Sequence, residues 1–306
     1  MKKDKTPCKR YYRQRAHCNP LSDSYIKYPL NYNYVDWKLH YPYYFKNENI
    51  IENKEKKNEN ALKDIEYNND NDNSKDQTDR NIINKETNKE INDLMGDVNK
   101  LYLNTNKHPI TYDKIICSKS NNHEVKFLDI GCGYGGLLFA LSKLFNDKLI
   151  LGLEIRDKIT NYVGEKIISY RNNHYPYYNN ISIIRTNAIK FLPNYIKKNQ
   201  IEKIFFCFPD PHFKKHNWRR RIITLENLSL YYHLLQKNGL IYFITDVFTL
   251  HLWVKYCFYK FPYFKLLSHE EYKDDICIKL IHESSEESKK VKRNNQNMYF
   301  CIAKKI

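Results

Sequence analysis

From residue 125 to the end of the chain, short apolar runs alternate with amphipathic stretches, as in a sheet whose strands are connected by helices. The apolar runs predict strands at 125–130, 148–154, 181–186, 203–208, 240–246, 264–267 and 298–304. The amphipathic stretches predict helices at 134–145, 158–172, 189–197, 225–235 and 250–258, with Lys237-Asn238-Gly239 as the C-terminal end of the fourth. This alternation predicts an α/β fold with an open, seven-stranded, mostly parallel sheet flanked by helices.

A glycine-rich turn joins the first predicted strand to the first predicted helix. It reads Gly131-Cys132-Gly133-Tyr134-Gly135-Gly136 and follows Asp129-Ile130. A strand, a tight glycine turn and a helix form the first unit of a nucleotide-binding domain, because the helix presents its N-terminal N–H groups to the ligand. The second strand ends in Glu154, whose carboxylate can accept hydrogen bonds from both hydroxyls of a ribose. We interpret the turn and Glu154 as a nucleotide site; a glycine loop without a ligand is the alternative.

Further site candidates lie where the other strands end, because ligands of open α/β sheets bind outside the carboxyl ends of the strands. The candidates at these ends are Gly131, Glu154, Asn187, Asp210 and Asp246. Asp210 stands between Pro209 and Pro211, which restrict the backbone on both sides of one carboxylate. The alternative for Asp210 is an ordinary turn residue.

A basic segment follows Asp210 closely. It reads Lys214-Lys215-His216-Asn217-Trp218-Arg219-Arg220-Arg221. Lysine and arginine contact phosphates, and a tryptophan can stack on a base. Although such charge runs are commonly solvated surface, its position beside Asp210 indicates a site that admits one nucleotide of a long polyanion.

Composition divides the chain into three parts. Residues 1–45 form a basic, aromatic N-terminal arm, which we expect to be extended and packed on the catalytic domain. Residues 46–122 form an Asn-rich insertion that we expect to be disordered, since it has no periodic apolar face. Residues 123–306 form the domain with alternating strands and helices.

The charge of the whole chain indicates a polyanionic partner. The net charge is +16 over 306 residues, whereas residues 46–100 carry 10 Lys or Arg against 14 Asp or Glu, so the basic charge lies outside the insertion. Eight scattered cysteines without a Cys-x-x-Cys pair argue against a zinc ribbon and indicate a reducing compartment. We expect no metal and no membrane segment.

Several of these motifs together resemble the eukaryotic tRNA (guanine-N7-)-methyltransferases. The resemblance covers residues 9–45 and 124–306. It is carried by the run 9–20 (KRYYRQRAHCNP), the spaced pairs Tyr28-Pro29, Asp36-Trp37 and Tyr41-Pro42, the turn 129–138, the strand 149–156, the loop 206–214 and the strand 244–247.

This resemblance implies a Rossmann-like class I methyltransferase fold, S-adenosylmethionine as methyl donor, and N7 of a guanosine in the tRNA variable loop as acceptor. The implied catalytic residue is Asp210. The implied cofactor contacts are Gly131, Glu154, Arg156, Asn187, Ala188, Cys207, Ser285 and Glu287. The basic residues expected to bind RNA are Lys9, Arg10, Arg13, Arg15, Lys214, Lys215, Arg219, Arg220 and Arg221. A WD-repeat β-propeller subunit and residence in the nucleus, with the cytosol as an additional location, are also implied.

Two positions depart from the family pattern. Ser288 replaces a glycine of the C-terminal cofactor loop and would be strained if that position needs a positive φ. Cys207 replaces a leucine and offers less apolar surface to an adenine. By composition alone, residues 284–290 are a polar loop.

Three alternatives stay open at this stage. A methyltransferase of the same fold acting on a small molecule or a protein would explain Gly131 and Glu154, but not the arm or the basic segment. An RNA-binding subunit without catalytic activity would not need Asp210 together with the glycine turn. A dehydrogenase is disfavoured because the turn reads Gly-x-Gly-x-Gly-Gly and not Gly-x-Gly-x-x-Gly.

Overall fold

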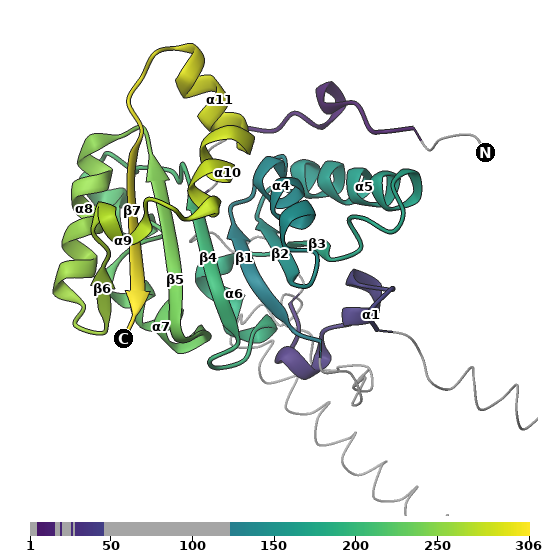
Figure 1. Ribbon diagram of the computed structural model, residues 1–306, viewed down its shortest axis with the longest axis horizontal. Coiled ribbons are helices and arrows are strands. Elements are labelled where there is room, and N and C mark those ends of the chain that lie inside the picture. The colour runs from purple at the N-terminus through teal and green to yellow at the C-terminus, as the bar shows by residue number, and fades with distance from the viewer. Residues whose placement is uncertain (1–4, 16–18, 20–25, 27, 46–122) are drawn as a thin grey trace, which may run out of the picture. The chain divides into compact units, whose positions relative to one another are not determined.

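A computed structural model describes residues 5–15, 19, 26, 28–45 and 123–306 of the chain. The prediction of a disordered insertion at residues 46–122 lies outside the described residues. The described residues form one seven-stranded sheet in the order β3-β2-β1-β4-β5-β7-β6 (Figure 1). The strands are β1 Val125–Ile130, β2 Leu149–Glu154, β3 Ile181–Arg185, β4 Ile201–Cys207, β5 Leu235–Thr245, β6 Phe264–Leu266 and β7 Tyr299–Lys305.

The sheet is parallel from β1 to β5, and β7 pairs antiparallel with both β5 and β6. The predicted mostly parallel α/β sheet is therefore confirmed. Parallel strands have to be connected by crossovers, and helices provide them. These helices are α4 Gly136–Leu144, α5 Asp157–Asn173, α6 Ala188–Tyr195, α7 Leu225–Leu234 and α8 Phe248–Lys260. The C-terminal part adds α9 His269–Tyr272, α10 Ile276–Ser284 and α11 Glu286–Arg293.

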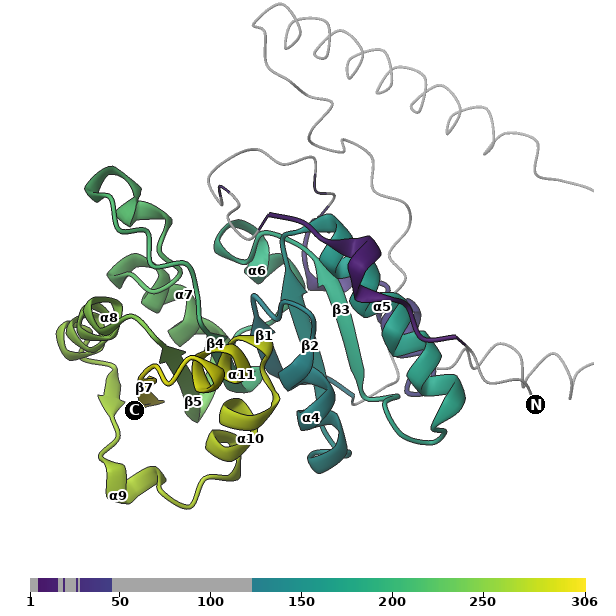
Figure 2. The same ribbon diagram turned by 90° about the horizontal axis from the view of Figure 1, so that it is seen from above.

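Each face of the sheet is covered by its own hydrophobic cluster. Successive side chains of a strand point to opposite faces, so Ile204 and Phe206 of β4 enter one cluster and Phe205 enters the other. The first cluster joins the strands to α6, α7 and α8, and the second joins them to α4, α5 and α10. Figure 2 shows α4 and α10 on one side of the sheet and α6 and α7 on the other.

The N-terminal arm contains short helical turns, which differs from the expected extended chain. These are η1 Lys9–Tyr12, η2 Tyr32–Tyr34 and α1 Trp37–His40. Its packing on the domain is close: Tyr41 is fully buried and its hydroxyl donates a 3.0 Å hydrogen bond to the Ile150 carbonyl of β2. Tyr28 stacks on Phe191 of α6 with ring centroids 4.0 Å apart.

Two local predictions were wrong. Residues 237–239 do not end a helix: α7 ends at Leu234, and the chain joins the sheet at once, with Leu235 paired to Ile201. The four residues between that pair and the next bulge outward, and Asn238 adopts the left-handed conformation at φ 63. Residues 286–290 form the start of helix α11 and not a loop, because the Ser285 hydroxyl caps the helix by accepting a hydrogen bond from the Ser288 N–H.

Candidate active site at the carboxyl ends of the strands

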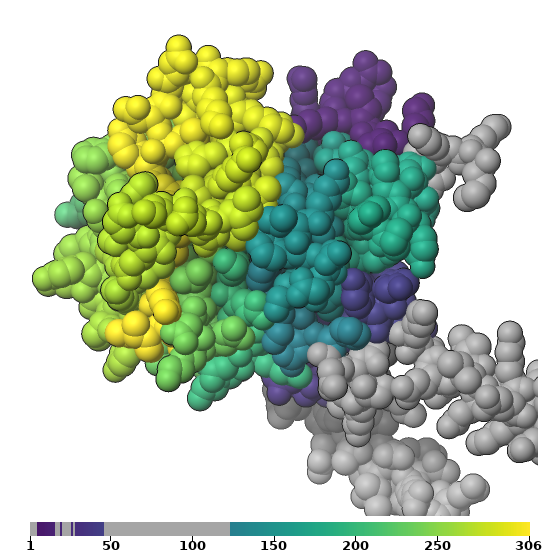
Figure 3. Space-filling view, viewed as in Figure 1, coloured from purple at the N-terminus to yellow at the C-terminus, as the bar shows by residue number. Residues whose placement is uncertain are grey.

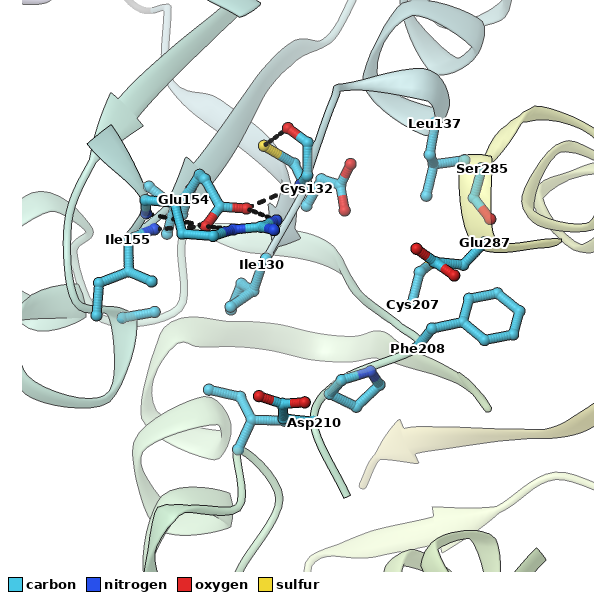
Figure 4. Close-up of a pocket in the computed structure, with 18 of the residues that line it drawn as sticks. Ile130, Cys132, Leu137, Glu154, Ile155, Cys207, Phe208, Asp210, Ser285 and Glu287 are labelled. Carbon is cyan, nitrogen blue, oxygen red and sulfur yellow. Dashed lines mark hydrogen bonds and ion pairs between the residues drawn. The ribbon is translucent and has the colours of Figure 1, made fainter. Parts of the chain in front are cut away.

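A cavity of about 690 Å³ opens where β1, β2, β4 and β5 end. Glu154, Asp210 and the stretch from Ser285 to Glu287 lie on three sides of it (Figure 4). All nine residues predicted for catalysis and cofactor binding line this one cavity: Gly131, Glu154, Arg156, Asn187, Ala188, Cys207, Asp210, Ser285 and Glu287. The strand-end residue Asp246 lines it as well. Convergence of these residues shows where a ligand fits, while the role of each residue stays a prediction.

The glycine turn allows a ligand on one side and helix α10 on the other to come close to its backbone. Gly131 has φ +74, a conformation that side chains other than glycine rarely adopt, and a Cβ there would meet no atom within 4 Å. Gly136 begins α4, and a Cβ on it would lie 2.2 Å from the Ser284 carbonyl oxygen at the end of α10. The first glycine therefore leaves room on the ligand side, and the second lets α4 and α10 meet.

The carboxylate of Glu154 is buried and held by five hydrogen bonds. The backbone N–H groups of Gly133, Ile155 and Arg156 donate to it at 3.1, 2.9 and 3.0 Å. The Arg156 guanidinium donates two more, at 3.0 Å from Nε and 2.9 Å from Nη2. These donors fix both oxygens at the edge of the cavity, in the position predicted for a ribose partner.

Asp129 is a site residue that the sequence interpretation missed. Its side chain is only 2% exposed and lines the cavity, and its Oδ2 has no hydrogen-bond partner within the part of the chain that the structure describes. Burial, with a smaller contribution from Glu154, raises the pKa of Asp129 to about 7. The sequence did contain a signal for Asp129, namely an acidic residue one position before the end of an apolar strand. In its ionised form Asp129 makes this end of the cavity attractive to a cationic ligand, because the charge of Glu154 is already paired with Arg156.

The loop that carries Asp210 has an unusual backbone. Phe208 and His212, on either side of it, adopt positive φ values of 52 and 47. Positive φ is rare for residues with large side chains and is maintained only when the surroundings enforce it. The Phe208 N–H donates to the Ile244 carbonyl of β5 at 2.8 Å, which anchors the first side of the loop.

Helix α11 closes a further side of the cavity. Ser285, Glu286, Glu287 and Lys290 line it. Ser288 is fully buried in the helix and is not among the residues with positive φ; its hydroxyl donates to the Ile281 carbonyl at 2.9 Å. The strain considered for serine at this position is therefore absent from the structure.

The basic residues predicted to bind RNA differ in their surroundings. Arg13, Arg15, Lys214, Lys215 and Arg219 are exposed. Arg220 lines the cavity, with its Nε buried and lacking a partner among the described residues.

The arm reaches the rim of the cavity through Lys9. Its ammonium pairs with Glu286 of α11 at 2.9 Å and lies 4.0 Å from the centre of the Tyr134 ring. Figure 3 shows the purple arm next to the yellow C-terminal segment. Arg10 lies against Tyr11.

Among the described residues, no group of three or more His, Cys, Asp or Glu side chains is placed to hold a metal ion. The same residues contain no helix long and apolar enough to cross a membrane.

Comparison with known proteins was made at the level of families, sequences and structures. Residues 123–301 match a family described as "Putative methyltransferase". The chain is 36% identical to the "tRNA (guanine-N(7)-)-methyltransferase" of Zea mays, over 99% of this chain and 94% of that protein. It is 37% identical to the protein of the same name from Xenopus laevis, over 98% of this chain and 89% of that protein. Among solved structures, one titled "Structure of an antibiotic related Methyltransferase" is 16% identical, with a TM-score of 0.38 over 60% of this chain and 89% of that one.

Proposed function

The chain belongs to the family of tRNA (guanine-N7-)-methyltransferases, and on this premise we propose that it transfers a methyl group from S-adenosylmethionine to N7 of a guanosine in the variable loop of tRNA. The observation that carries the proposal is that Asp210 lines the same cavity as the glycine turn and Glu154. The cofactor half of the site, formed by the glycine turn and Glu154, and the acceptor half, formed by the loop that carries Asp210, therefore line the same cavity.

The residues of the cavity fit S-adenosylmethionine. The acid side chain of Asp129 has an unpartnered oxygen, which suits the ammonium of the methionine part. Glu154 lies at the cavity edge, where ribose hydroxyls can take the place of the Arg156 guanidinium as donors to its carboxylate, and the open space beside Gly131 lets a ligand approach the backbone. Asn187, Ala188 and Cys207 line the same cavity and would contact the adenine. When bound, the cofactor supplies an electrophilic methyl group on a sulfonium.

The chain's own contribution to the transfer is positioning and electrostatics. N7 of guanine carries a lone pair and no proton, so no strong general base is required. Asp210 accepts hydrogen bonds from guanine N1–H and the exocyclic amino group, which orients N7. Its negative charge also stabilises the positive charge that develops on the methylated base. The exposed lysines and arginines of the arm and of residues 214–219 bind the tRNA backbone.

The β-propeller partner and the nuclear location are supported only by the resemblance of the chain to eukaryotic members of the family. Coexpression of the chain with the WD-repeat subunit of its own organism tests the partner by co-purification. A fluorescent fusion tests the location.

Nucleoside mass spectrometry tests the activity itself. The chain, with and without the β-propeller subunit, is incubated with unmodified tRNA and S-adenosylmethionine carrying a labelled methyl group. We expect labelled 7-methylguanosine at one position of the variable loop. Label in another nucleoside, or only in small acceptors supplied in parallel, would contradict the proposed acceptor.

A further inference from the structure

Arg221 lies beside a pair of indole rings, whose centres are 6.4 Å apart, and contacts the backbone of the Asp210 loop. Its guanidinium is 5.1 Å from the ring centre of Trp218 and 5.0 Å from that of Trp253 in α8. Its Nε donates to the Pro211 carbonyl at 3.0 Å, and its Nη2 is 3.5 Å from the His212 carbonyl. Arginine suits this place because its planar fork can stack on aromatic rings and donate in two directions at once.

The two indoles are themselves anchored. Trp253 Nε1 donates to the Ile223 carbonyl at 2.9 Å, and Trp218 Nε1 donates to the Phe213 carbonyl at 3.2 Å. Arg221 and Trp218 together therefore contact three consecutive carbonyls, those of Pro211, His212 and Phe213. These three residues follow Asp210 directly.

This part of the loop needs outside support, because His212 has φ 47 and a strained backbone persists only when its surroundings enforce it. The first side of the loop is held by the sheet through Phe208. On the second side the acceptors are carbonyls beyond the end of β4, and the side chains of Arg221 and Trp218 supply the donors. Arg221 does not line the cavity, unlike its neighbour Arg220.

We propose that Arg221, held against the rings of Trp218 and Trp253, is a positioning residue that fixes the loop carrying Asp210 for methyl transfer. This inference rests on the proposed function of Asp210. It gives Arg221 a role different from the phosphate contact expected from its place in the basic segment. The neighbouring exposed Arg219 remains a candidate for that contact.

The test replaces Arg221 by lysine, which keeps the positive charge but loses the planar fork. For Arg221→Lys we expect kcat to fall about tenfold to a hundredfold at saturating tRNA, with the cofactor Kd and the tRNA Kd changed less than twofold. The slope of tRNA affinity against salt should stay unchanged, since no phosphate contact is lost. In an Asp210→Asn background, Arg221→Lys should cost less than twofold further, because it acts through that carboxylate.

Arg171 provides a matched control. It too donates to backbone carbonyls, those of His40, Tyr178 and Ile181, and it lies outside the cavity. Arg171→Lys should lower the melting temperature and leave kcat unchanged. Equal losses of kcat in the two variants would show that Arg221 only stabilises the fold and does not position the Asp210 loop. A weaker tRNA Kd and a flatter salt slope, with normal kcat, would show that it binds phosphate.

A second measurement does not depend on activity or on one variant. Hydrogen exchange of the ligand-free chain should become faster in residues 207–213 of Arg221→Lys, while residues 125–136 exchange as before. Trp253→Phe replaces one of the two indole rings against Arg221 and should give the same pattern to a smaller extent, which covers the case that Arg221→Lys does not fold. Unchanged exchange in residues 207–213 would overturn the inference. A wild-type chain that methylates no tRNA would instead overturn the proposed function.

Discussion

The glycine turn and the Asp210 loop face each other across one cavity, and both contain residues with positive φ. In the turn these residues are Gly131, Gly133 and Gly135, for which the conformation carries no steric cost. In the Asp210 loop they are Phe208 and His212, for which it does. The turn therefore holds its shape through its own sequence, whereas the loop depends on donors supplied from elsewhere.

The groups that hold Glu154 also differ from those that hold the Asp210 loop. Glu154 is held by backbone donors from Ile155 and Arg156, which follow it directly, and from Gly133, 21 residues earlier in the glycine turn. The Asp210 loop is held by Arg221 and by a ring from α8 more distant in sequence. The cofactor site is held largely by backbone donors and is preformed, whereas the acceptor site is held by side chains of the basic segment and of α8 and can be altered without disturbing it. The following experiments test this independence.

The largest effect is expected for Asp210→Asn, which keeps the shape of the side chain and removes its charge. Loss of one preorganised electrostatic contact to the transition state should lower kcat by about a hundredfold to a thousandfold. The cofactor Kd, measured by calorimetry, should stay within twofold because Glu154 and the turn are untouched. A much weaker cofactor Kd in this variant would show that the two halves are coupled.

Gly136→Ala is the reciprocal change, made in the cofactor half. The new Cβ would lie 2.2 Å from the Ser284 carbonyl, so α10 and the attached α11 have to shift. Overpacking of this kind costs about 1–3 kcal/mol, and we expect the cofactor Kd to weaken by about tenfold to a hundredfold. With saturating cofactor, kcat should return to near the wild-type value. Gly164→Ala is the matched control, since its Cβ would meet no atom closer than 3.9 Å.

The same difference explains what the sequence could predict. The strand 125–130, the turn and Glu154 are encoded by local patterns, and the structure has them where the pattern predicts. Three consecutive arginines, in contrast, look alike in sequence. Only the tertiary fold exposes Arg219, places Arg220 at the cavity and holds Arg221 against two indole rings.

Helix α11 was missed for a related reason. Its sequence, Glu-Glu-Ser-Lys-Lys-Val-Lys-Arg, has one apolar side chain in eight residues, so no apolar stripe marks it as a helix. The helix is stabilised by the Ser285 cap and by burial of Ser288 and Val291. A serine at the cap position was visible in the sequence, but burial of a second serine was not.

The pH dependence of cofactor binding tests Asp129 in the cofactor half. Its pKa of about 7 in the folded chain lies above the ordinary value, so its stabilising effect is present at low pH and is lost as pH rises toward 7. A cationic cofactor prefers the ionised form. We therefore expect the ligand-free chain to lose stability between about pH 4 and 7, and the cofactor Kd to tighten about tenfold from pH 6 to 8.

Asp129→Asn supplies the control for this pH effect, because an amide does not titrate. The variant should show a flat cofactor Kd over the same range and a flatter melting temperature against pH. Methylation by the variant at saturating cofactor should keep the kcat of the wild type, since the acceptor half is unchanged. A pH profile that persists in Asp129→Asn would assign the titration to another group of the cavity.

The smallest effect is expected for Ser288→Gly, which restores the residue type of the family at this position. The Ser288 hydroxyl donates to the Ile281 carbonyl, and glycine is a poor helix residue, so the variant should lose about 1–2 kcal/mol of stability. The cofactor Kd should change less than twofold, because Ser288 is already helical. Ser288→Ala separates the lost hydroxyl from the backbone effect. Tighter cofactor binding by Ser288→Gly than by Ser288→Ala would mean that α11 rearranges on binding and that the cofactor half is less preformed than the turn indicates.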